Sequence, residues 1–416
     1  MSVARVYKSR LSGSVKAPPS KSYSHRILIC SAFASSPVRI KGLEFSADVS
    51  ATAECLSRLG AGIEKCVDGC IVTPVKHTKN AVFDCGESGS TLRFMLPVAA
   101  AAGGKYVFEG SGRLPLRPNG PLVSALTEGG VSVEGEGLPL QLKGKLCGGA
   151  YKIDCGMSSQ YLTGLLLAAP LIGEDVSIEV SGGTASASYV ALTTDVMKAF
   201  GVEVEVSDNV YFVKGGQKYI SPGEIEVEGD WSNAAFFLAA GILSGEVSVY
   251  GLNPFSKQGD RAVADIFKRF GGDIKYEKGA FIAKKSALKG IKANLDNAID
   301  LAPIVSVVAA FSDGETVLTG VGRLKIKESD RLSAVCGLLK SFGAAYEVGE
   351  DRLVIRGKAA SADVKADGLN DHRIVMAAVS AGALCGVSVT CPEAVNKSYP
   401  AFFTDYSRIG GVFDVE

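Results

Sequence analysis

A sixfold internal repeat constrains what this 416-residue chain can fold into more than any other feature. In each copy, a few small polar residues precede an apolar stretch rich in Ala, Leu and Val, and the copies begin at Ser20, Ser88, Ser158, Ser232, Asp300 and Asp371. Their spacings are 68, 70, 74, 68 and 71 residues. Self-similarity at a fixed period indicates that one supersecondary unit is used repeatedly. The chain should therefore contain six copies of one folding unit.

Each copy has the pattern of a βαβαββ unit. The apolar stretch is hydrophobic on all sides, which predicts a helix that is buried on every face. A short β-rich segment follows, as in 176–178, and then a helix with a single apolar stripe, as in 261–270. A strand pair such as 345–348 and 352–355 completes the copy. Six such α/β units fit two domains of three, and the longest spacing places the boundary near Gly229.

The composition excludes several classes of function. Lys plus Arg equals Asp plus Glu, 44 of each, so no overall charge favours nucleic acid or a membrane surface. The ten cysteines lack zinc-finger spacing and lie mostly in apolar runs, which favours buried, reduced thiols. Residues 1–7 lack the apolar core of a signal peptide, and the longest apolar runs are too short to span a bilayer. Nucleotide-binding glycine motifs are also missing. We therefore expect a soluble, cytoplasmic protein without a metal or a cofactor.

The starts of the buried helices carry many cations and hydroxyl groups. A helix N-terminus attracts anions because its N–H groups are unpaired, and an Arg guanidinium binds two oxygens of a carboxylate or phosphate. If the repeats superpose, these starts converge at one end of each domain, and so many cations with few acids would bind two anionic substrates side by side. The residues concerned are Lys21, Ser22, Arg26, Gly89, Ser90, Arg93, Arg117, Ser158, Ser159, Gln160, Ser186, Tyr189, Asp300, Lys327, Glu328, Arg331, His372, Arg373 and Lys397.

Simpler interpretations of the same residues stay open. The start at Ser20 is also typical of a capped helix with two solvated cations. Asp300 could cap a helix or act as a general base, and Glu328 could deliver a proton or pair with a neighbouring cation. His372 could be an acid, a base or only a hydrogen-bond donor.

Several phrases of the sequence, taken together, resemble one known family. In chain order they are P-x-SKSYSHR, ESGSTLR, LRP, SSQ, S-x-S-Y, KESDR and NDHR. From the first repeat to Lys397, the chain resembles the 5-enolpyruvylshikimate-3-phosphate (EPSP) synthase family of enolpyruvyl transferases. The resemblance implies an inside-out α/β barrel of two domains joined by a double crossover. One domain, 15–228, would lie mainly on the shikimate 3-phosphate side, and the other would comprise 1–14 and 229–416, with the active site in the cleft between them.

The same resemblance implies a reaction and a role for each residue. The enolpyruvyl group of phosphoenolpyruvate would pass to the 5-hydroxyl of shikimate 3-phosphate, with release of phosphate, through a tetrahedral intermediate on the shikimate pathway to chorismate and aromatic amino acids. Asp300 would take the hydroxyl proton, and Glu328 or Lys21 would protonate the methylene carbon. Shikimate 3-phosphate would contact Lys21, Ser22, Arg26, Ser158, Ser159, Gln160, Ser186, Tyr189, Asp300 and Lys327. Phosphoenolpyruvate would contact Lys21, Gly89, Arg117, Gln160, Arg331, His372, Arg373 and Lys397.

Two departures from the family pattern concern the phosphoenolpyruvate site. Glu87 stands where many members have Asn, and Phe94 follows Arg93 where proline is frequent. Gly89 predicts inhibition by glyphosate, which resembles phosphoenolpyruvate in the site. Phe94 weakens that expectation, because it could shift the helix that begins at Gly89.

Two other functions fit part of the pattern. The UDP-N-acetylglucosamine 1-carboxyvinyltransferases share the fold and the donor, but that family has a reactive cysteine in the loop that corresponds to 113–121, which contains none here. A non-catalytic anion-binding scaffold would account for the cations without using Asp300 and Glu328. The partners we expect are the two small-molecule substrates of a monomeric enzyme.

Overall fold

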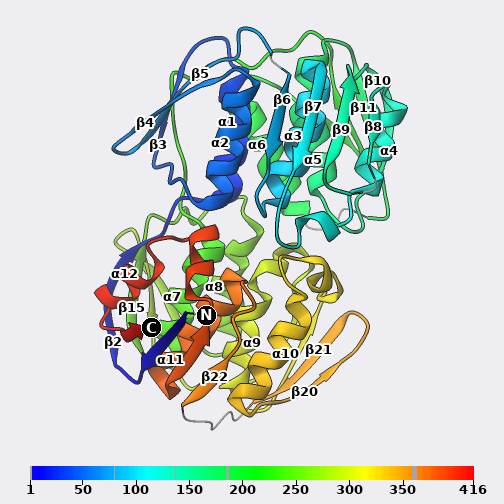
Figure 1. Ribbon diagram of the computed structural model, residues 1–416. Helices are drawn as coiled ribbons and strands as arrows, with labels where there is room; N and C mark the ends of the chain where they lie inside the picture. Colours follow the sequence, from blue (N-terminus) through cyan, green and yellow to red (C-terminus); the bar gives the residue numbers. More distant parts are fainter. Residues whose placement is uncertain (1, 79, 136, 184–186, 358–362) are drawn as a thin grey trace. The chain divides into compact units, whose positions relative to one another are not determined.

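Twelve α-helices and six four-stranded sheets make up the described part of the chain, residues 2–78, 80–135, 137–183, 187–357 and 363–416 of a computed structural model (Figure 1). Each sheet has a parallel pair of strands at one edge, followed by two antiparallel strands. In the sheet β6-β7-β9-β8, for example, β6 (Ala81–Asp84) runs parallel to β7 (Gly104–Glu109), and β7 is antiparallel to β9 (Leu140–Gly144). The predicted α/β fold of six repeated units is confirmed.

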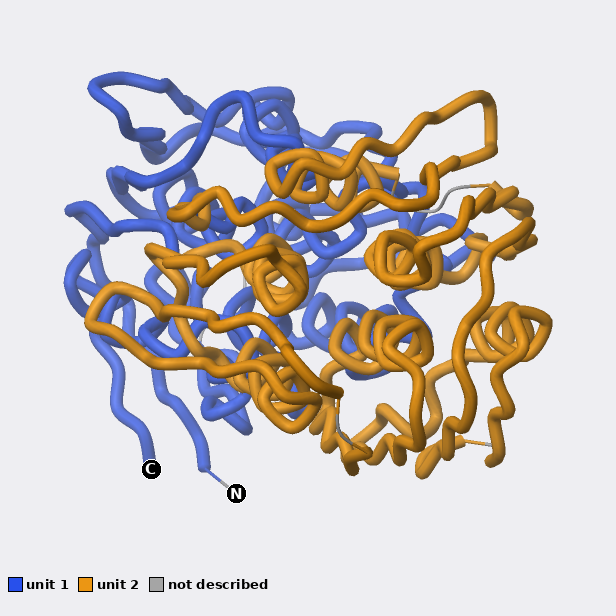
Figure 2. The backbone as a smooth tube through the Cα atoms, turned by 90° about the horizontal axis from the view of Figure 1, so that it is seen from above, with its two compact units in different colours: residues 1–18, 229–416 blue, residues 19–228 orange. Residues whose placement is uncertain are grey.

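The chain forms two compact units, each with three sheets and its own apolar core (Figure 2). Unit 1 comprises residues 1–18 and 229–416, and unit 2 comprises residues 19–228. The helices of unit 2 are α1 (Lys21–Ala32), α2 (Ala47–Leu59), α3 (Gly89–Ala102), α4 (Gly120–Glu128), α5 (Gln160–Ile172) and α6 (Ala187–Ala199). Its other strands are β3 (Val38–Lys41), β4 (Gly62–Cys66), β5 (Gly69–Thr73), β8 (Ser132–Glu134), β10 (Gly149–Asp154), β11 (Val176–Ser181), β12 (Glu205–Ser207), β13 (Val210–Val213) and β14 (Glu224–Glu226).

Unit 1 repeats this plan. Its helices are α7 (Trp231–Ser244), α8 (Val263–Arg269), α9 (Ala302–Ala310), α10 (Arg331–Phe342), α11 (His372–Cys385) and α12 (Phe402–Arg408). Its strands are β1 (Val3–Tyr7), β2 (Leu11–Lys16), β15 (Gly245–Tyr250), β16 (Asp273–Glu277), β17 (Ala280–Lys284), β18 (Lys292–Asn294), β19 (Glu315–Thr319), β20 (Ala345–Val348), β21 (Arg352–Arg356), β22 (Val364–Ala366), β23 (Val387–Thr390) and β24 (Val412–Val415). Short 3-10 helices occur at η1 (Leu114–Leu116), η2 (Gly259–Ala262), η3 (Asp296–Leu301), η4 (Gly322–Ile326) and η5 (Pro392–Lys397).

Two repeats do not use the strand that precedes their buried helix. Strand β2, which comes just before α1, pairs in parallel with β15 of the fourth repeat. The first repeat is completed instead by β14, which runs parallel to β3. The repeat pattern assigns each helix the strand before it, and this is wrong for the first and fourth copies because the chain passes between the units at those points. For the same reason unit 1 continues to Pro18, four residues past the boundary predicted at residue 14.

The first helix of each repeat is buried, and the second covers a sheet. Every residue of α7 is buried, and α3 and α5 lie side by side within unit 2 (Figure 1). Helix α10 buries one stripe that includes Val335 and Leu339, as its spacing predicts. It ends at Gly343 with φ 78°, a left-handed conformation that glycine adopts without strain. The helix predicted over 261–270 begins as the 3-10 turn η2 and continues as α8.

Side-chain caps stabilise four of the six buried helices in the described ranges. The N-cap side chain accepts a hydrogen bond from a first-turn N–H at Ser20, Ser88, Asp230 and Asp371. Asp300 differs, because it lies inside η3, and the N-cap of α9 is Leu301. The interpretation of Asp300 as a helix cap is therefore wrong.

The ten cysteines are all free, and seven of them are buried. No helix within the described ranges is long and apolar enough to cross a membrane. The buried thiols pack as small apolar groups, as their positions in apolar runs predict.

Candidate active site

The N-terminus of α1 holds Lys21 in an ion pair with the next helix. Lys21 Nζ donates to Asp48 Oδ2 at 2.7 Å, and the two side chains are 14% and 12% exposed. Asp48 lies in the first turn of α2, where the helix dipole favours a carboxylate. The ammonium is thus positioned at the helix start while part of it still faces solvent.

Arg26 is not a solvated cation, and that interpretation of the α1 start is wrong for this residue. It is 2% exposed and donates to Thr193 Oγ1 at 2.9 Å, the Tyr189 carbonyl at 3.2 Å and Thr163 Oγ1 at 3.4 Å. Its guanidinium also lies over the Phe94 ring, 4.9 Å from the centroid. Burial lowers its pKa to about 10, so the side chain remains charged at neutral pH. Arg26 therefore joins α1 to α3, α5 and α6.

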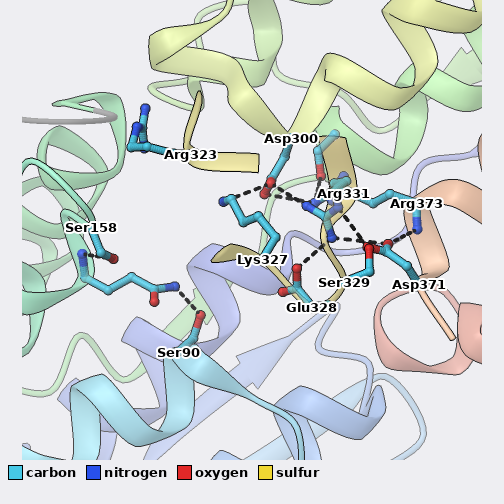
Figure 3. Close-up of polar contacts among 12 residues, drawn as sticks. Ser90, Ser158, Asp300, Arg323, Lys327, Glu328, Ser329, Arg331, Asp371 and Arg373 are labelled. Carbon is cyan, nitrogen blue, oxygen red and sulfur yellow. Dashed lines mark hydrogen bonds and ion pairs between the residues drawn. The ribbon is translucent and has the colours of Figure 1, made fainter. Parts of the chain in front are cut away.

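Residues of the second and third repeats come together around the start of α3. Arg117 is 8% exposed, and a Cβ added at Gly89 would lie 2.6 Å from its Nη1 atom. Only glycine leaves room for the guanidinium at this point. Gln160 Nε2 donates to Ser90 Oγ at 2.9 Å (Figure 3). Gln160 Oε1 accepts from Arg93 Nη1 at 2.8 Å. The amide of Gln160 is therefore held in one orientation.

The other predicted residues of unit 2 lie near the same helix starts. Ser158 Oγ accepts from the Gln160 N–H at 3.2 Å, and Ser159 is the buried N-cap residue of α5. Tyr189 lies on α6, where its carbonyl accepts from Arg26. Ser186 lies outside the described residues. The carbonyl of Ser22 accepts from Arg26 Nη1 at 2.7 Å.

In unit 1, a single guanidinium contacts three carboxylates (Figure 3). Arg331 is 1% exposed, and its Nε and Nη2 atoms donate to the two oxygens of Asp371 at 2.9 and 3.2 Å. Its Nη1 donates to Asp300 Oδ1 at 3.1 Å, and its Nη2 also donates to Glu328 Oε2 at 2.6 Å. Burial would lower the pKa of Arg331, but the charges of the three carboxylates outweigh it and raise that pKa. Arg331 therefore stays charged and orients both carboxylates that were predicted to move protons.

Asp300 contacts two further cations. Its Oδ1 accepts from Lys327 Nζ at 3.2 Å, and its Oδ2 accepts from Arg373 Nη2 at 3.2 Å. Burial alone would raise the pKa of Asp300, but the charges of Arg373, Lys327 and Arg331 outweigh it and hold that pKa well below its usual value. Asp300 is thus ionised. An anionic ligand that drew these cations away would make it a stronger base.

Asp371 ties this cluster to the start of α11. It is fully buried and accepts from Ser329 Oγ at 2.8 Å and from the Arg373 N–H at 2.9 Å. Burial would raise its pKa, but the positive charge of Arg331 outweighs this effect and lowers the pKa overall. Asp371 therefore acts as helix cap and as ion-pair partner at once.

The last two predicted residues lie at the same helix start. His372 is the first residue of α11 and is 1% exposed. Lys397, at the end of η5, donates from Nζ to the Asn370 carbonyl at 2.6 Å. The seven predicted residues of unit 1 thus come from four elements and one connecting segment. Asp300 lies on η3, Arg331 on α10, His372 and Arg373 on α11, and Lys397 on η5, while Lys327 and Glu328 lie between η4 and α10.

Sequence reasoning missed the carboxylates that hold the cations. The expectation of few acids at the helix starts is wrong, because Asp48 pairs with Lys21 and Asp371 pairs with Arg331. These partners are 27 and 40 residues apart, so no local pattern links them. The only signal was positional, since Asp371 belongs to the NDHR phrase that opens the sixth buried helix.

The arrangement offers carboxylates and cations but no group of metal ligands. Among the residues that the structure describes, no group of three or more His, Cys, Asp or Glu side chains is placed to hold a metal ion. The acids of unit 1 instead contact Arg and Lys. The chemistry available to these groups is proton transfer and the binding of anions.

The fold is that of the enolpyruvyl transferases. The enolpyruvyl transferase NikO from Streptomyces tendae superposes with a TM-score of 0.79 over 100% of this chain and 99% of its own, and at 15% identity it shows the fold alone. The EPSP synthase from Acinetobacter baumannii superposes with a TM-score of 0.82 at 27% identity, over 100% of both chains.

The sequence comparisons identify the family within this class. The family model for EPSP synthase (3-phosphoshikimate 1-carboxyvinyltransferase) matches residues 6–406. The 3-phosphoshikimate 1-carboxyvinyltransferases of Clostridium acetobutylicum and Clostridium beijerinckii are 39% and 38% identical, over 99% of this chain and 98% of theirs. The chain belongs to the EPSP synthase family, as its motifs predicted. It is an enzyme that transfers the enolpyruvyl group of phosphoenolpyruvate to shikimate 3-phosphate in the biosynthesis of aromatic compounds.

Proposed function

We propose that Asp300 and Glu328 move the protons in this transfer. Asp300 takes the proton of the 5-hydroxyl as that oxygen bonds to C2 of phosphoenolpyruvate, and Glu328 protonates the methylene carbon to give a tetrahedral intermediate. A proton then leaves the new methyl group, the C2–phosphate oxygen bond breaks, and the enol ether and phosphate are the products. The observation that carries this proposal is that both carboxylates contact one buried guanidinium, Arg331, at 3.1 and 2.6 Å.

The cations around Asp300 support a link between substrate binding and basicity. Phosphoenolpyruvate carries a phosphate and a carboxylate, and both would compete with Asp300 for Arg331 and Arg373. Each cation that turned to the ligand would raise the pKa of Asp300, which these cations hold low. The base would thus become effective when the donor is bound.

The binding residues named from the resemblance remain a proposal. Shikimate 3-phosphate would use Lys21, Ser22, Arg26, Ser158, Ser159, Gln160, Ser186, Tyr189, Asp300 and Lys327. Phosphoenolpyruvate would use Lys21, Gly89, Arg117, Gln160, Arg331, His372, Arg373 and Lys397. The contacts of Gly89 with Arg117 and of Lys397 with the start of α11 support the second set.

A phosphate-release assay tests the proposed reaction. We expect phosphate from phosphoenolpyruvate with shikimate 3-phosphate as acceptor and none with UDP-N-acetylglucosamine. Turnover only with the nucleotide sugar would overturn the acceptor assignment. Binding of both ligands by calorimetry without phosphate release would instead support the anion-binding scaffold.

Gly89→Ala should raise KM for phosphoenolpyruvate by about tenfold to a hundredfold, because the new Cβ displaces the Arg117 guanidinium from its place 2.6 Å away. KM for shikimate 3-phosphate should change much less. The matched control is Gly120→Ala, since a Cβ there meets no atom within 4 Å. An unchanged KM for phosphoenolpyruvate would mean that Arg117 does not bind this substrate. The inhibition by glyphosate predicted from Gly89 can be measured in the same assay.

We also propose that the enzyme works in the cytoplasm as a monomer. The ten free thiols are typical of a reducing compartment. Each unit has its own apolar core, so neither needs a second chain to bury its helices.

A further inference from the structure

A chain of buried polar side chains crosses the core of unit 2. His25 Nδ1 lies 2.7 Å from Thr52 Oγ1, and Thr52 Oγ1 lies 2.7 Å from Thr91 Oγ1. Thr91 Oγ1 lies 2.8 Å from Ser88 Oγ, which also accepts from the Thr91 N–H at 3.1 Å. All four residues are at most 1% exposed. The chain links α1, α2 and the N-cap of α3, which also contribute apolar residues to the core of unit 2.

The donors in this chain can be ordered. The Thr91 hydroxyl donates its one proton to Ser88 Oγ or to the Asp48 carbonyl, 3.3 Å away. When it does so, it accepts from Thr52, whose oxygen in turn accepts from an N–H at Nδ1 of His25. In this order His25 is the neutral Nδ1–H tautomer, with a lone pair on Nε2. Nε2 has no hydrogen-bond partner among the described residues, and a buried lone pair costs less than a buried N–H without an acceptor.

The surroundings of His25 keep the ring neutral and fixed. Burial lowers its pKa well below the usual value, and the charges of Lys21 and Arg26 lower it further. The Phe94 ring contacts it edge to face, with the centroids 6.2 Å apart. A charged imidazole would have to donate at both nitrogens, and Thr52 can accept from only one of them.

The Ser88–Thr91 end of the chain adjoins residues of the proposed donor site. Ser88 directly precedes Gly89, and Thr91 follows it by two residues; a Cβ added at Gly89 would lie 2.6 Å from Arg117 Nη1. The Asp48 carbonyl meets Thr91 Oγ1, while the Asp48 carboxylate pairs with Lys21. Thr91 therefore connects residue Asp48 of the Lys21–Asp48 pair to the start of α3, and Thr52 and His25 extend this polar connection to α1.

We propose that His25, Thr52 and Thr91 are positioning residues that hold the start of α3, with Gly89, in register with Lys21 for the binding of phosphoenolpyruvate. This inference rests on the proposed donor site. A hydrogen bond in a nonpolar core is directional, so the chain restricts rotation and sliding of α1, α2 and α3 beyond the restriction that apolar packing provides. A polar chain that only stabilised the core would affect both substrates and turnover equally.

Thr52→Val tests the role, because it keeps the side-chain shape and removes the central hydroxyl. We expect KM for phosphoenolpyruvate to rise about fivefold to tenfold, the equivalent of one lost hydrogen bond, with KM for shikimate 3-phosphate and kcat changed less than about twofold. Thr52→Ser, which retains the hydroxyl, should restore KM for phosphoenolpyruvate. The matched control is Thr316→Val in β19, a buried threonine of unit 1 whose Oγ1 accepts from the Ile291 N–H at 3.4 Å.

The kinetic result can overturn the proposal in two ways. Either KM for phosphoenolpyruvate stays at the wild-type value in Thr52→Val, or it rises equally in Thr316→Val. Failure of the proposed reaction itself is distinguishable, because the wild-type enzyme would then release no phosphate with the two substrates.

Nitrogen-15 NMR of histidine tests the chain without any activity. The protein has three histidines, so ring-labelled enzyme gives three pairs of signals, and the pair lost in His25→Gln belongs to His25. We expect the neutral Nδ1–H tautomer at pH 7, and a shift of its Nδ1 signal in Thr52→Val. An Nε2–H tautomer or a protonated ring would overturn the ordering of donors, and with it the positioning role.

Discussion

Asp300→Asn should reduce kcat by about two to four orders of magnitude, because the amide cannot take the 5-hydroxyl proton. The substitution nearly preserves shape, and it removes the negative charge that Lys327, Arg331 and Arg373 contact at 3.1 to 3.2 Å. These cations would then be more available to the anionic donor. KM for phosphoenolpyruvate should therefore stay the same or fall, and steady-state phosphate release at varied phosphoenolpyruvate measures both parameters.

A buried carboxylate elsewhere in unit 1 serves as the control for this substitution. Asp405 is 6% exposed and accepts from Tyr399 Oη at 2.7 Å, so Asp405→Asn makes a similar change away from η3. Its kcat should stay within about threefold of the wild type, since it weakens only the hydrogen bond from Tyr399 and the ion pair with the exposed Arg408. If Asp300→Asn retained a kcat within tenfold of the wild type, the proton acceptor would have to be another group.

Arg331→Met should reduce the free energy of unfolding of unit 1 by about 3 to 5 kcal/mol. The guanidinium is 1% exposed, so its removal leaves the fully buried Asp371 without its cation and takes one cationic partner from Asp300 and from Glu328. The single tryptophan, Trp231, is fully buried in the same unit, and its fluorescence during urea unfolding reports the change.

The loss of unfolding free energy in Arg331→Met should become smaller as the pH falls. The folded-state pKa values of Asp371 and Asp300 lie below the unfolded value of 3.8, so these groups stabilise the fold above that pH and lose their contribution as the pH falls toward the folded values. Without Arg331 the pKa of Asp371 rises, because protonation removes the unpaired charge. The difference between wild type and variant should therefore shrink on acidification below about pH 5.

Two variants test whether the ion pairs cause the loss. Arg331→Met with Asp371→Asn should recover part of the stability, since the double variant no longer leaves that charge unpaired. Arg356→Met removes a half-exposed arginine that pairs with Glu347 and Glu315, and it should cost at most about 1 kcal/mol. Equal losses in Arg331→Met and Arg356→Met would contradict the role given to the buried cluster.

The sequence predicted those site residues whose position depends on a single helix start. Lys21, Arg26 and Gly89 stand at the starts of two buried helices, and the pattern of small polar residues before an apolar stretch locates those starts. The same pattern predicted a cap at Asp300, where the structure instead has a 3-10 helix and three cations on the carboxylate. A local pattern cannot distinguish these cases, because the deciding partners come from other repeats.

The sequence alone determined the six repeats, the buried and covering helices, and the family, because each depends on periodicity or on short phrases within one copy. Only the tertiary structure decided that β2 and β14 exchange places between repeats, since strand pairing depends on where the chain crosses between the units. It also decided what each cation contacts. Asp300 and Arg373 are 73 residues apart in the chain and 3.2 Å apart in space, and a charge is neutralised by its neighbours in space.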